Sequence, residues 1–99
     1  MIRKDSILEI LDENEKTIKR FGVKRIGVFG SFARRAHTEN SDLDILVEFK
    51  KGQKTFDHYI GLKEVLEKLF NRKVDLVIKE AIKPRIKSVI LRETRYAGL

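Results

Sequence analysis

The segment from Asp42 to Phe49 alternates between two kinds of side chain, and this alternation restricts the fold more than any other feature of the sequence. Successive residues of a β-strand point to opposite faces of a sheet, so such a segment predicts a strand with one buried face. The face expected to be buried is apolar: Leu43, Ile45, Val47 and Phe49. The other face carries three acids and a leucine: Asp42, Asp44, Leu46 and Glu48.

Two segments with helical spacing flank this strand. The first is expected to form a helix over about residues 6–20, because Ser6 to Glu9 has the form of a capping box and Gly22 is placed to end the helix. The second is expected to run from a Thr55 cap to about Asn71. Its apolar stripe has helical spacing: Tyr59, Leu62, Val65, Leu66 and Leu69.

Shorter segments complete the order of elements. Strands are predicted at 25–29 and 74–78, and a helical turn at 32–35. Pro84 suits the first turn of a last helix. The inward face of that helix is expected to contain Ile86, Val89 and Ile90. Because strands and helices alternate without a repeat or linker, we expect one α/β domain over residues 1–99, with flanking helices on a small mixed β-sheet of three strands.

Composition favours an anionic partner without naming it. The 99-residue chain has 22 Lys and Arg against 15 Asp and Glu, a net charge of +7. A charge-rich chain from a heat-loving organism would have a similar composition. There is no cysteine and no apolar run near the roughly 20 residues that cross a membrane. We therefore expect a cytoplasmic protein without disulfides, thiolate metal sites or membrane contact.

Asp42 and Asp44 form the first half of a candidate site. They are two positions apart on one strand, so their carboxylates share a face and repel each other unless a cation lies between them. Asp75 would add a third carboxylate if the strand over residues 74–78 pairs beside the first. Carboxylate oxygens are hard ligands that select Mg²⁺ or Mn²⁺, so we expect one of these ions at Asp42, Asp44 and Asp75.

Gly30 and Ser31 form the second half, where a strand turns into a helical segment. Glycine permits unusual backbone angles and close approach of a phosphate, and the Ser31 amide and hydroxyl can bind phosphate oxygens. Arg34 or Arg35, one turn along, could neutralise further phosphate charge. Such a site suits a nucleotide whose phosphates are bridged by two metal ions.

The run from Gly30-Ser31 to Asp42-Leu43-Asp44 resembles the Gly-Ser-x10-Asp-x-Asp signature of the polymerase-beta nucleotidyltransferase superfamily, with Asp75 where a third acid follows. The short length and the run Ser41 to Phe49 resemble the minimal nucleotidyltransferases (MNT), which are commonly antitoxins of HEPN-domain ribonuclease toxins. Pro84 to Tyr96 also resembles that family's C-terminal helix, so the resemblance covers nearly the whole chain.

The resemblance implies a polymerase-beta-like palm fold and transfer of AMP from ATP to a tyrosine of the HEPN toxin. By the same resemblance, Asp42 and Asp44 would bind two Mg²⁺ ions, and Asp75 would bind the catalytic ion and help to deprotonate the acceptor. Gly30, Ser31 and Arg34 would bind the nucleotide. A partner protein is expected to complete the site, with exposed apolar surface on a terminal helix as one means of contact.

Other interpretations of these residues remain open. Asp42 could be a turn residue that binds backbone amides, and Asp75 could pair with Lys73 or Arg72 on an edge strand. Gly30-Ser31 could be an ordinary turn. His37 and His58 are expected at the surface, and Glu48 is expected in solvent beyond the site.

Other functions also remain open. The chain could neutralise a partner by occlusion with a vestigial site, or transfer a nucleotide to a small molecule. Direct nucleic-acid binding through the +7 charge is not expected, because the sequence has no aromatic-rich stacking surface.

Overall fold

A computed structural model describes residues 4–33 and 42–98 of the chain. Helices and strands alternate along it. The elements of the first half are α1 (Lys4–Glu13), α2 (Glu15–Lys19), β1 (Val23–Phe29), α3 (Gly30–Ala33) and β2 (Leu43–Phe49). Those of the second half are α4 (Phe56–Phe70), β3 (Val74–Ile78), the 3₁₀ helix η1 (Lys79–Ala81), α5 (Pro84–Glu93) and β4 (Arg95–Tyr96). None of the described helices is long and apolar enough to cross a lipid bilayer.

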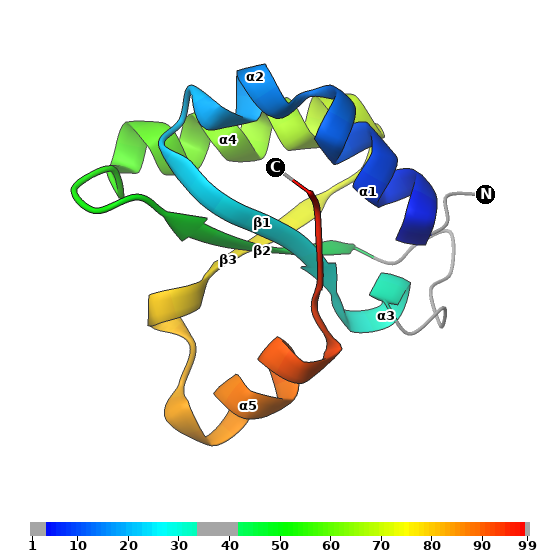
Figure 1. Ribbon diagram of the computed structural model, residues 1–99, viewed down its shortest axis with the longest axis vertical. Coiled ribbons are helices and arrows are strands. Elements are labelled where there is room, and N and C mark those ends of the chain that lie inside the picture. Colours follow the sequence, from blue (N-terminus) through cyan, green and yellow to red (C-terminus); the bar gives the residue numbers. More distant parts are fainter. Residues whose placement is uncertain (1–3, 34–41, 99) are drawn as a thin grey trace.

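The four strands form one mixed sheet in the order β3-β2-β1-β4. β2 is antiparallel to β1 and parallel to β3, so α4 is the crossover between two parallel neighbours. Helices α1, α2 and α4 lie on one side of the sheet and α5 lies on the other (Figure 1). The expected α/β architecture with a small mixed sheet is therefore confirmed.

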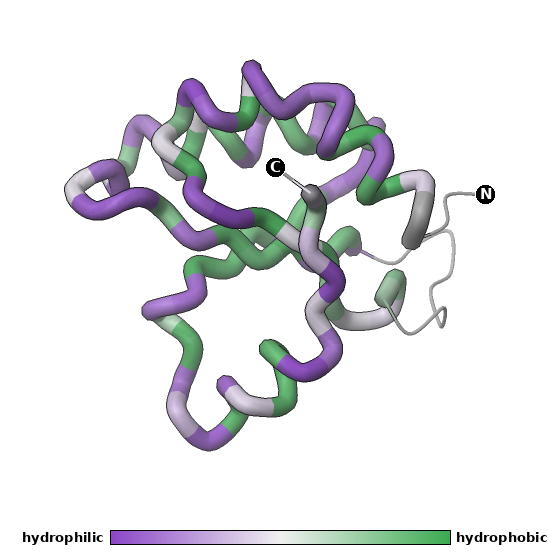
Figure 2. Tube along the Cα trace, in the orientation of Figure 1, coloured by the Kyte–Doolittle hydropathy of each residue, from purple (hydrophilic) through white to green (hydrophobic). Residues whose placement is uncertain are grey.

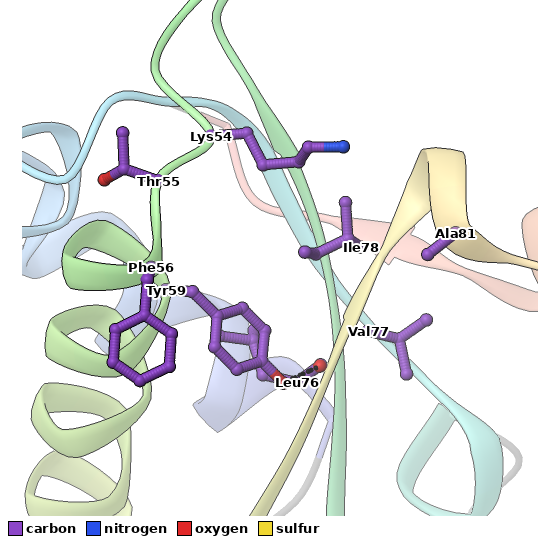
Figure 3. Close-up of a pocket in the computed structure, with 8 residues that line it drawn as sticks. All are labelled: Lys54, Thr55, Phe56, Tyr59, Leu76, Val77, Ile78 and Ala81. Carbon is purple, nitrogen blue, oxygen red and sulfur yellow. Dashed lines mark hydrogen bonds between the residues drawn. The ribbon is translucent and has the colours of Figure 1, made fainter.

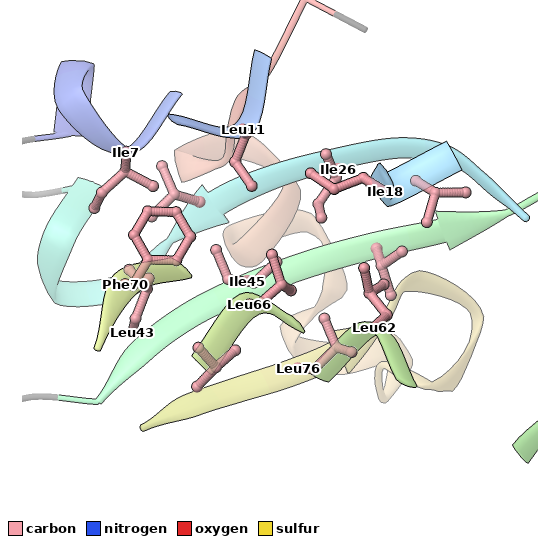
Figure 4. Close-up of a cluster of buried hydrophobic side chains, with 14 of the residues drawn as sticks. Ile7, Leu11, Ile18, Ile26, Leu43, Ile45, Leu62, Leu66, Phe70 and Leu76 are labelled. Carbon is pink, nitrogen blue, oxygen red and sulfur yellow. The ribbon is translucent and has the colours of Figure 1, made fainter. Parts of the chain in front are cut away.

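The main core lies between the sheet and helices α1, α2 and α4 (Figure 4). The apolar face of β2 points into it, as its alternation predicts. Ile18, Leu62 and Leu66 are fully buried contributions from the helices. Along the chain trace, the hydrophobic segments gather in the central strands and the outward helical turns are hydrophilic (Figure 2). Apolar burial of this kind is the main favourable term in folding.

Helix α4 has the boundaries that its sequence predicts. The Thr55 hydroxyl accepts a hydrogen bond from the His58 backbone N–H at 3.1 Å, which satisfies one of the unpaired donors of the first turn. Asn71 ends the helix in the left-handed conformation, with φ of 48°. The helix is thus set between two local signals that are visible in the sequence.

The predicted first helix over residues 6–20 is wrong in two respects. It begins at Lys4, so Ser6 lies inside its first turn, where serine is tolerated, and does not cap it. It is also interrupted at Asn14, which separates α1 from α2. The Asn14 side-chain amide donates to the Ile10 carbonyl at 2.8 Å, and this local bond competes with regular helical pairing.

The C-terminal segment also differs from expectation. Ile86 and Val89 do not face inward: they are 45% and 54% exposed, and no residue of α5 is buried. The reason is that the second face of the sheet has only a small apolar cluster, centred on Phe29, Leu46 and Ile82, against which α5 packs through Ile90 and Leu91.

A fourth strand, β4, follows α5 directly and was not expected. A two-residue strand shows no periodicity, so its pairing depends on its neighbours. Tyr96 pairs with Gly27, where a Cβ atom would lie 2.7 Å from the Arg95 carbonyl oxygen. The Arg25 guanidinium stacks 3.8 Å from the centre of the Tyr96 ring.

Candidate functional site

Asp44 and Asp75 are direct neighbours across the two parallel strands. The register pairs Asp44 with Asp75, between the pairs Leu43–Val74 and Ile45–Leu76. Leu43 and Ile45 point into the main core, so the two aspartates point to the opposite face of the sheet. The strand over residues 74–78 therefore pairs beside β2, which is the arrangement that a shared acidic site requires.

Gly30 lies against the Asp44 carboxylate at the end of β1. It has a φ of 72°, which favours glycine, and a Cβ atom at this position would overlap Asp44 Oδ2. Phe29, the preceding residue, is the register partner of Asp44. The Gly30-Ser31 turn and the paired aspartates are therefore brought to one place by adjacent strands, although they are far apart in the sequence.

The three acids differ in exposure. Asp44 is half-buried, whereas Asp42, just before β2, and Asp75 are exposed. Within the part of the chain that the structure describes, no ion pair involves Asp75, so the alternative pairing with Lys73 or Arg72 is not observed. An unpaired acid on an edge strand next to a second acid is electrostatically unfavourable without a counterion.

The paired carboxylates of Asp44 and Asp75 suit a hard divalent cation, because such ions prefer oxygen ligands. Within the described residues, no group of three His, Cys, Asp or Glu side chains is positioned to hold a metal ion. The role of Asp42, Asp44 and Asp75 as metal ligands therefore stays a prediction, supported by the pairing of two of them.

A pocket of about 460 Å³ opens beside Asp75 on the same face of the sheet. Its floor is apolar, with Phe29 and Val77 from the strands and Ile90 from α5. Lys83 and Arg85 add positive charge to its wall. A concave, mainly apolar site with a few charged groups is the usual form of a small-molecule site. Sequence reasoning did not single out Lys83 or Arg85, because both lie among many other basic residues.

A second pocket of about 500 Å³ lies at the edge of β3, between η1 and the start of α4 (Figure 3). Phe56 and Tyr59 of α4 line it, and the Tyr59 hydroxyl donates to the Leu76 carbonyl of β3 at 2.7 Å. The lining includes Lys54 but no acidic residue. This pocket therefore cannot supply the carboxylates that the sequence motif provides, although it is slightly larger.

Glu93, the last residue of α5, was missed by sequence reasoning. Its Oε1 accepts a hydrogen bond from the Gly30 backbone N–H at 3.1 Å. The two residues are 63 positions apart, so local spacing gives no signal for this contact. The C-terminal end of α5 thus contacts the Gly30-Ser31 turn directly.

The remaining predicted positions have different outcomes. Glu48 is only partly exposed: it lies 3.8 Å from Lys24 and 3.7 Å from Lys79, and its side chain is 16% exposed. The His58 ring is close to the Gln53 carbonyl at 2.7 Å, away from the acids, and is partly exposed. Arg34, with Arg35 and His37, lies outside the described residues, so its predicted phosphate role stays a prediction.

Comparison with known proteins relates nearly the whole chain to nucleotidyltransferases. The family model described as "Nucleotidyltransferase domain" matches residues 4–97. Protein adenylyltransferase MntA of Thermococcus cleftensis is 42% identical over 97 residues, and the match covers 97% of each chain. The sequence similarity therefore extends over nearly the whole of both proteins.

Two solved structures have the same fold. One, described as a "putative minimal nucleotidyltransferase", is 38% identical with a TM-score of 0.74, and the match covers 89% of this chain and 93% of that one. The other is a chain from the complex of a tri-AMPylated Shewanella oneidensis HEPN toxin with an MNT antitoxin. It is 16% identical with a TM-score of 0.61, covering 90% of this chain and 70% of that one, so this likeness concerns the fold alone.

Proposed function

This chain belongs to the nucleotidyltransferase domain family, and from that premise we propose that it is a protein adenylyltransferase. It transfers AMP from ATP to a hydroxyl group, a tyrosine of a partner HEPN-domain toxin, and so acts as the antitoxin of the pair. The observation that carries the proposal is the pairing of Asp44 with Asp75 beside Gly30, because it brings two acids next to the Gly30-Ser31 turn of the sequence motif.

The reaction is an in-line displacement at the α-phosphorus of ATP. The acceptor oxygen forms a bond to this phosphorus, the bond from it to the oxygen that bridges to the β-phosphorus breaks, and pyrophosphate leaves with the bonding electron pair. Asp75 helps to take the proton of the acceptor hydroxyl, which makes its oxygen a better nucleophile. The Ser31 amide and hydroxyl hold the terminal phosphates, and Gly30 lets this turn lie close to Asp44. Arg34 adds positive charge to the nucleotide site.

Asp42, Asp44 and Asp75 are the residues that would hold Mg²⁺ or Mn²⁺. When bound there, the cations neutralise charge on the triphosphate and on the leaving pyrophosphate. The oxygen-only donor set fits these ions. In the chain itself, the β2–β3 register places Asp44 and Asp75 side by side on adjacent strands.

Exposed apolar surface on α5 supports contact with a protein partner. Ile86 and Val89 are large apolar residues at 45% and 54% exposure, and Ile86 also lines the pocket beside Asp75. A surface of this kind next to a catalytic pocket suits a macromolecular acceptor. The names of the relatives support the same partner: one is a protein adenylyltransferase, and one solved complex contains an AMPylated HEPN toxin.

Labelled ATP, MgCl₂ and the purified candidate toxin, incubated with this chain, test the proposal. We expect label on the toxin at a tyrosine and loss of its ribonuclease activity. Chelation of the divalent ions with EDTA should prevent the transfer. No label on a folded toxin that binds the chain would contradict the proposed activity.

Neutralisation by occlusion is the second candidate, since the exposed α5 surface could act in binding alone. The double variant Asp42→Asn and Asp44→Asn separates the two functions. If catalysis neutralises the toxin, the variant still binds it but no longer protects cells. Unchanged protection would favour occlusion.

A further inference from the structure

Glu93 and Asp44 contact the same glycine from two different elements. The Glu93 carboxylate, at the end of α5, accepts the Gly30 backbone N–H at 3.1 Å. The Asp44 carboxylate, on β2, occupies the place that a side chain at Gly30 would fill. The Gly30-Ser31 turn is therefore held between strand β2 and helix α5.

We propose that Glu93 is a positioning residue for nucleotidyl transfer. By binding the Gly30 amide, it fixes the orientation of the Gly30-Ser31 turn and leaves the Ser31 amide and hydroxyl for the triphosphate. This inference rests on the proposed function, because it names a role toward the same nucleotide. Glu93 need not touch the nucleotide itself.

The packing of α5 supports a specific role for this contact. No residue of α5 is buried, and Ile86 and Val89 on its surface are exposed, so the body of the helix contributes little to the core. Its C-terminal end is held more firmly, because Thr94 is 6% exposed and Tyr96 pairs with Gly27 of β1. Glu93 lies at this fixed end, where its position relative to Gly30 is well determined.

The charge of Glu93 makes the role testable. A carboxylate near a triphosphate repels it, so removal of Glu93 should lower KM for ATP if only its charge mattered. If Glu93 positions the turn, its removal should raise KM. Glu93→Gln keeps a side-chain oxygen that can accept the Gly30 N–H and removes the negative charge. Glu93→Ala removes both the acceptor and the charge.

Steady-state kinetics distinguish these roles, measured with ATP and the toxin at a temperature where all variants are folded. We expect Glu93→Ala to raise KM for ATP about tenfold, with a smaller effect on kcat, since a hydrogen bond to a charged group is lost. Glu93→Gln should have a KM equal to or below that of the wild type. Glu64→Ala, which removes an exposed acid from α4, is the matched control and should leave both parameters unchanged.

Hydrogen exchange at the Gly30 amide, followed by ¹H–¹⁵N NMR without nucleotide, gives a second readout that is independent of activity. We expect protection in the wild type and in Glu93→Gln, and faster exchange in Glu93→Ala. Equal exchange in wild type and Glu93→Ala, or a lower KM for ATP in Glu93→Ala, would overturn the proposal. A wild type that transfers no AMP would instead refute the proposed function, and the positioning role with it.

Discussion

The two faces of the sheet differ in burial and in the residues that they present. On the face covered by α1, α2 and α4, the side chains of β2 that point inward are fully or nearly buried. On the other face, the same strand carries Asp44 next to Asp75, and among the described residues the buried part of the apolar cluster is Phe29, Leu46 and Ile82. The odd-numbered residues of β2 therefore contribute to the main core, whereas its opposite face carries Asp44 of the proposed site.

This difference has an energetic consequence. We call the face under α1, α2 and α4 the covered face and the face with Asp44 and Asp75 the open face. Burial of apolar area contributes on the order of 25 cal/mol per Å², so the covered face supplies most of the favourable free energy of folding. Paired like charges on adjacent strands are destabilising. Substitutions of the acids on the open face should abolish transfer while leaving the stability of the protein unchanged or higher. Substitutions on the covered face should lower stability with little effect on transfer.

The largest effect is expected from Asp75→Asn. AMP transfer should fall more than about 100-fold, because even the loss of a group that only supports a metal ligand costs about 10–100-fold. The midpoint of thermal unfolding should stay the same or rise, because the repulsion between Asp44 and Asp75 is relieved. Kinetics with labelled ATP and thermal unfolding of the same preparation measure both.

Asp57→Asn is the matched control for this change, since Asp57 is an exposed aspartate on α4, away from the open face. It should leave transfer unchanged. A clear loss of stability in Asp75→Asn, with activity retained, would mean that Asp75 is a structural residue and that the open face has no catalytic role.

Leu66→Ala tests the covered face. Leu66 is fully buried in the main core, so its truncation should lower the free energy of unfolding by about 2–5 kcal/mol. At a temperature where the variant is folded, kcat should stay close to the wild-type value. The cavity that the truncation leaves lies in the main core, on the side of the sheet opposite to Asp44 and Asp75. Leu69→Ala, at a half-buried position of the same helix, should cost less. Denaturant unfolding gives both values, and equal costs would contradict the described packing.

Val89→Asp tests whether the exposed surface of α5 binds the partner toxin. A charge at this 54% exposed position should leave the fold intact but weaken toxin binding by about tenfold, as for a single contact residue of an interface. Ser88→Asp places the same charge on a neighbouring exposed position and should weaken binding less. Calorimetric titration of the toxin measures this difference, and equal affinities for both variants would exclude Val89 from the interface.

The covered face was also the more predictable one. The apolar alternation of β2 and the helical stripe of α4 are periodic, and Thr55 and Asn71 mark the ends of α4, so these elements follow from local sequence. The adjacency of Asp44 and Asp75 could be expected only on condition that their strands pair. The register satisfies that condition, while the roles of the site residues stay predictions.

The open face depends on contacts between distant residues, and these were missed. The hydrogen bond between Gly30 and Glu93 joins residues 63 positions apart, and β4 forms because Gly27 lets a two-residue strand approach. The apolar spacing of Ile86 and Val89 suggested burial, but periodicity shows only that a helix has an apolar face. It does not show whether the chain itself or another molecule covers that face.

Thr55→Ala is expected to have the smallest effect and gives the finest test of the comparison. The Thr55 hydroxyl accepts the His58 N–H at 3.1 Å, and loss of this cap should cost about 1 kcal/mol of stability. Thr55→Ser keeps the hydroxyl and should restore most of this stability. Neither change should alter KM or kcat for transfer, because α4 packs on the covered face, away from the paired aspartates. If Thr55→Ala impaired transfer as well as stability in chemical unfolding and kinetic assays, the two faces would be coupled through α4, and the separation argued here would be wrong.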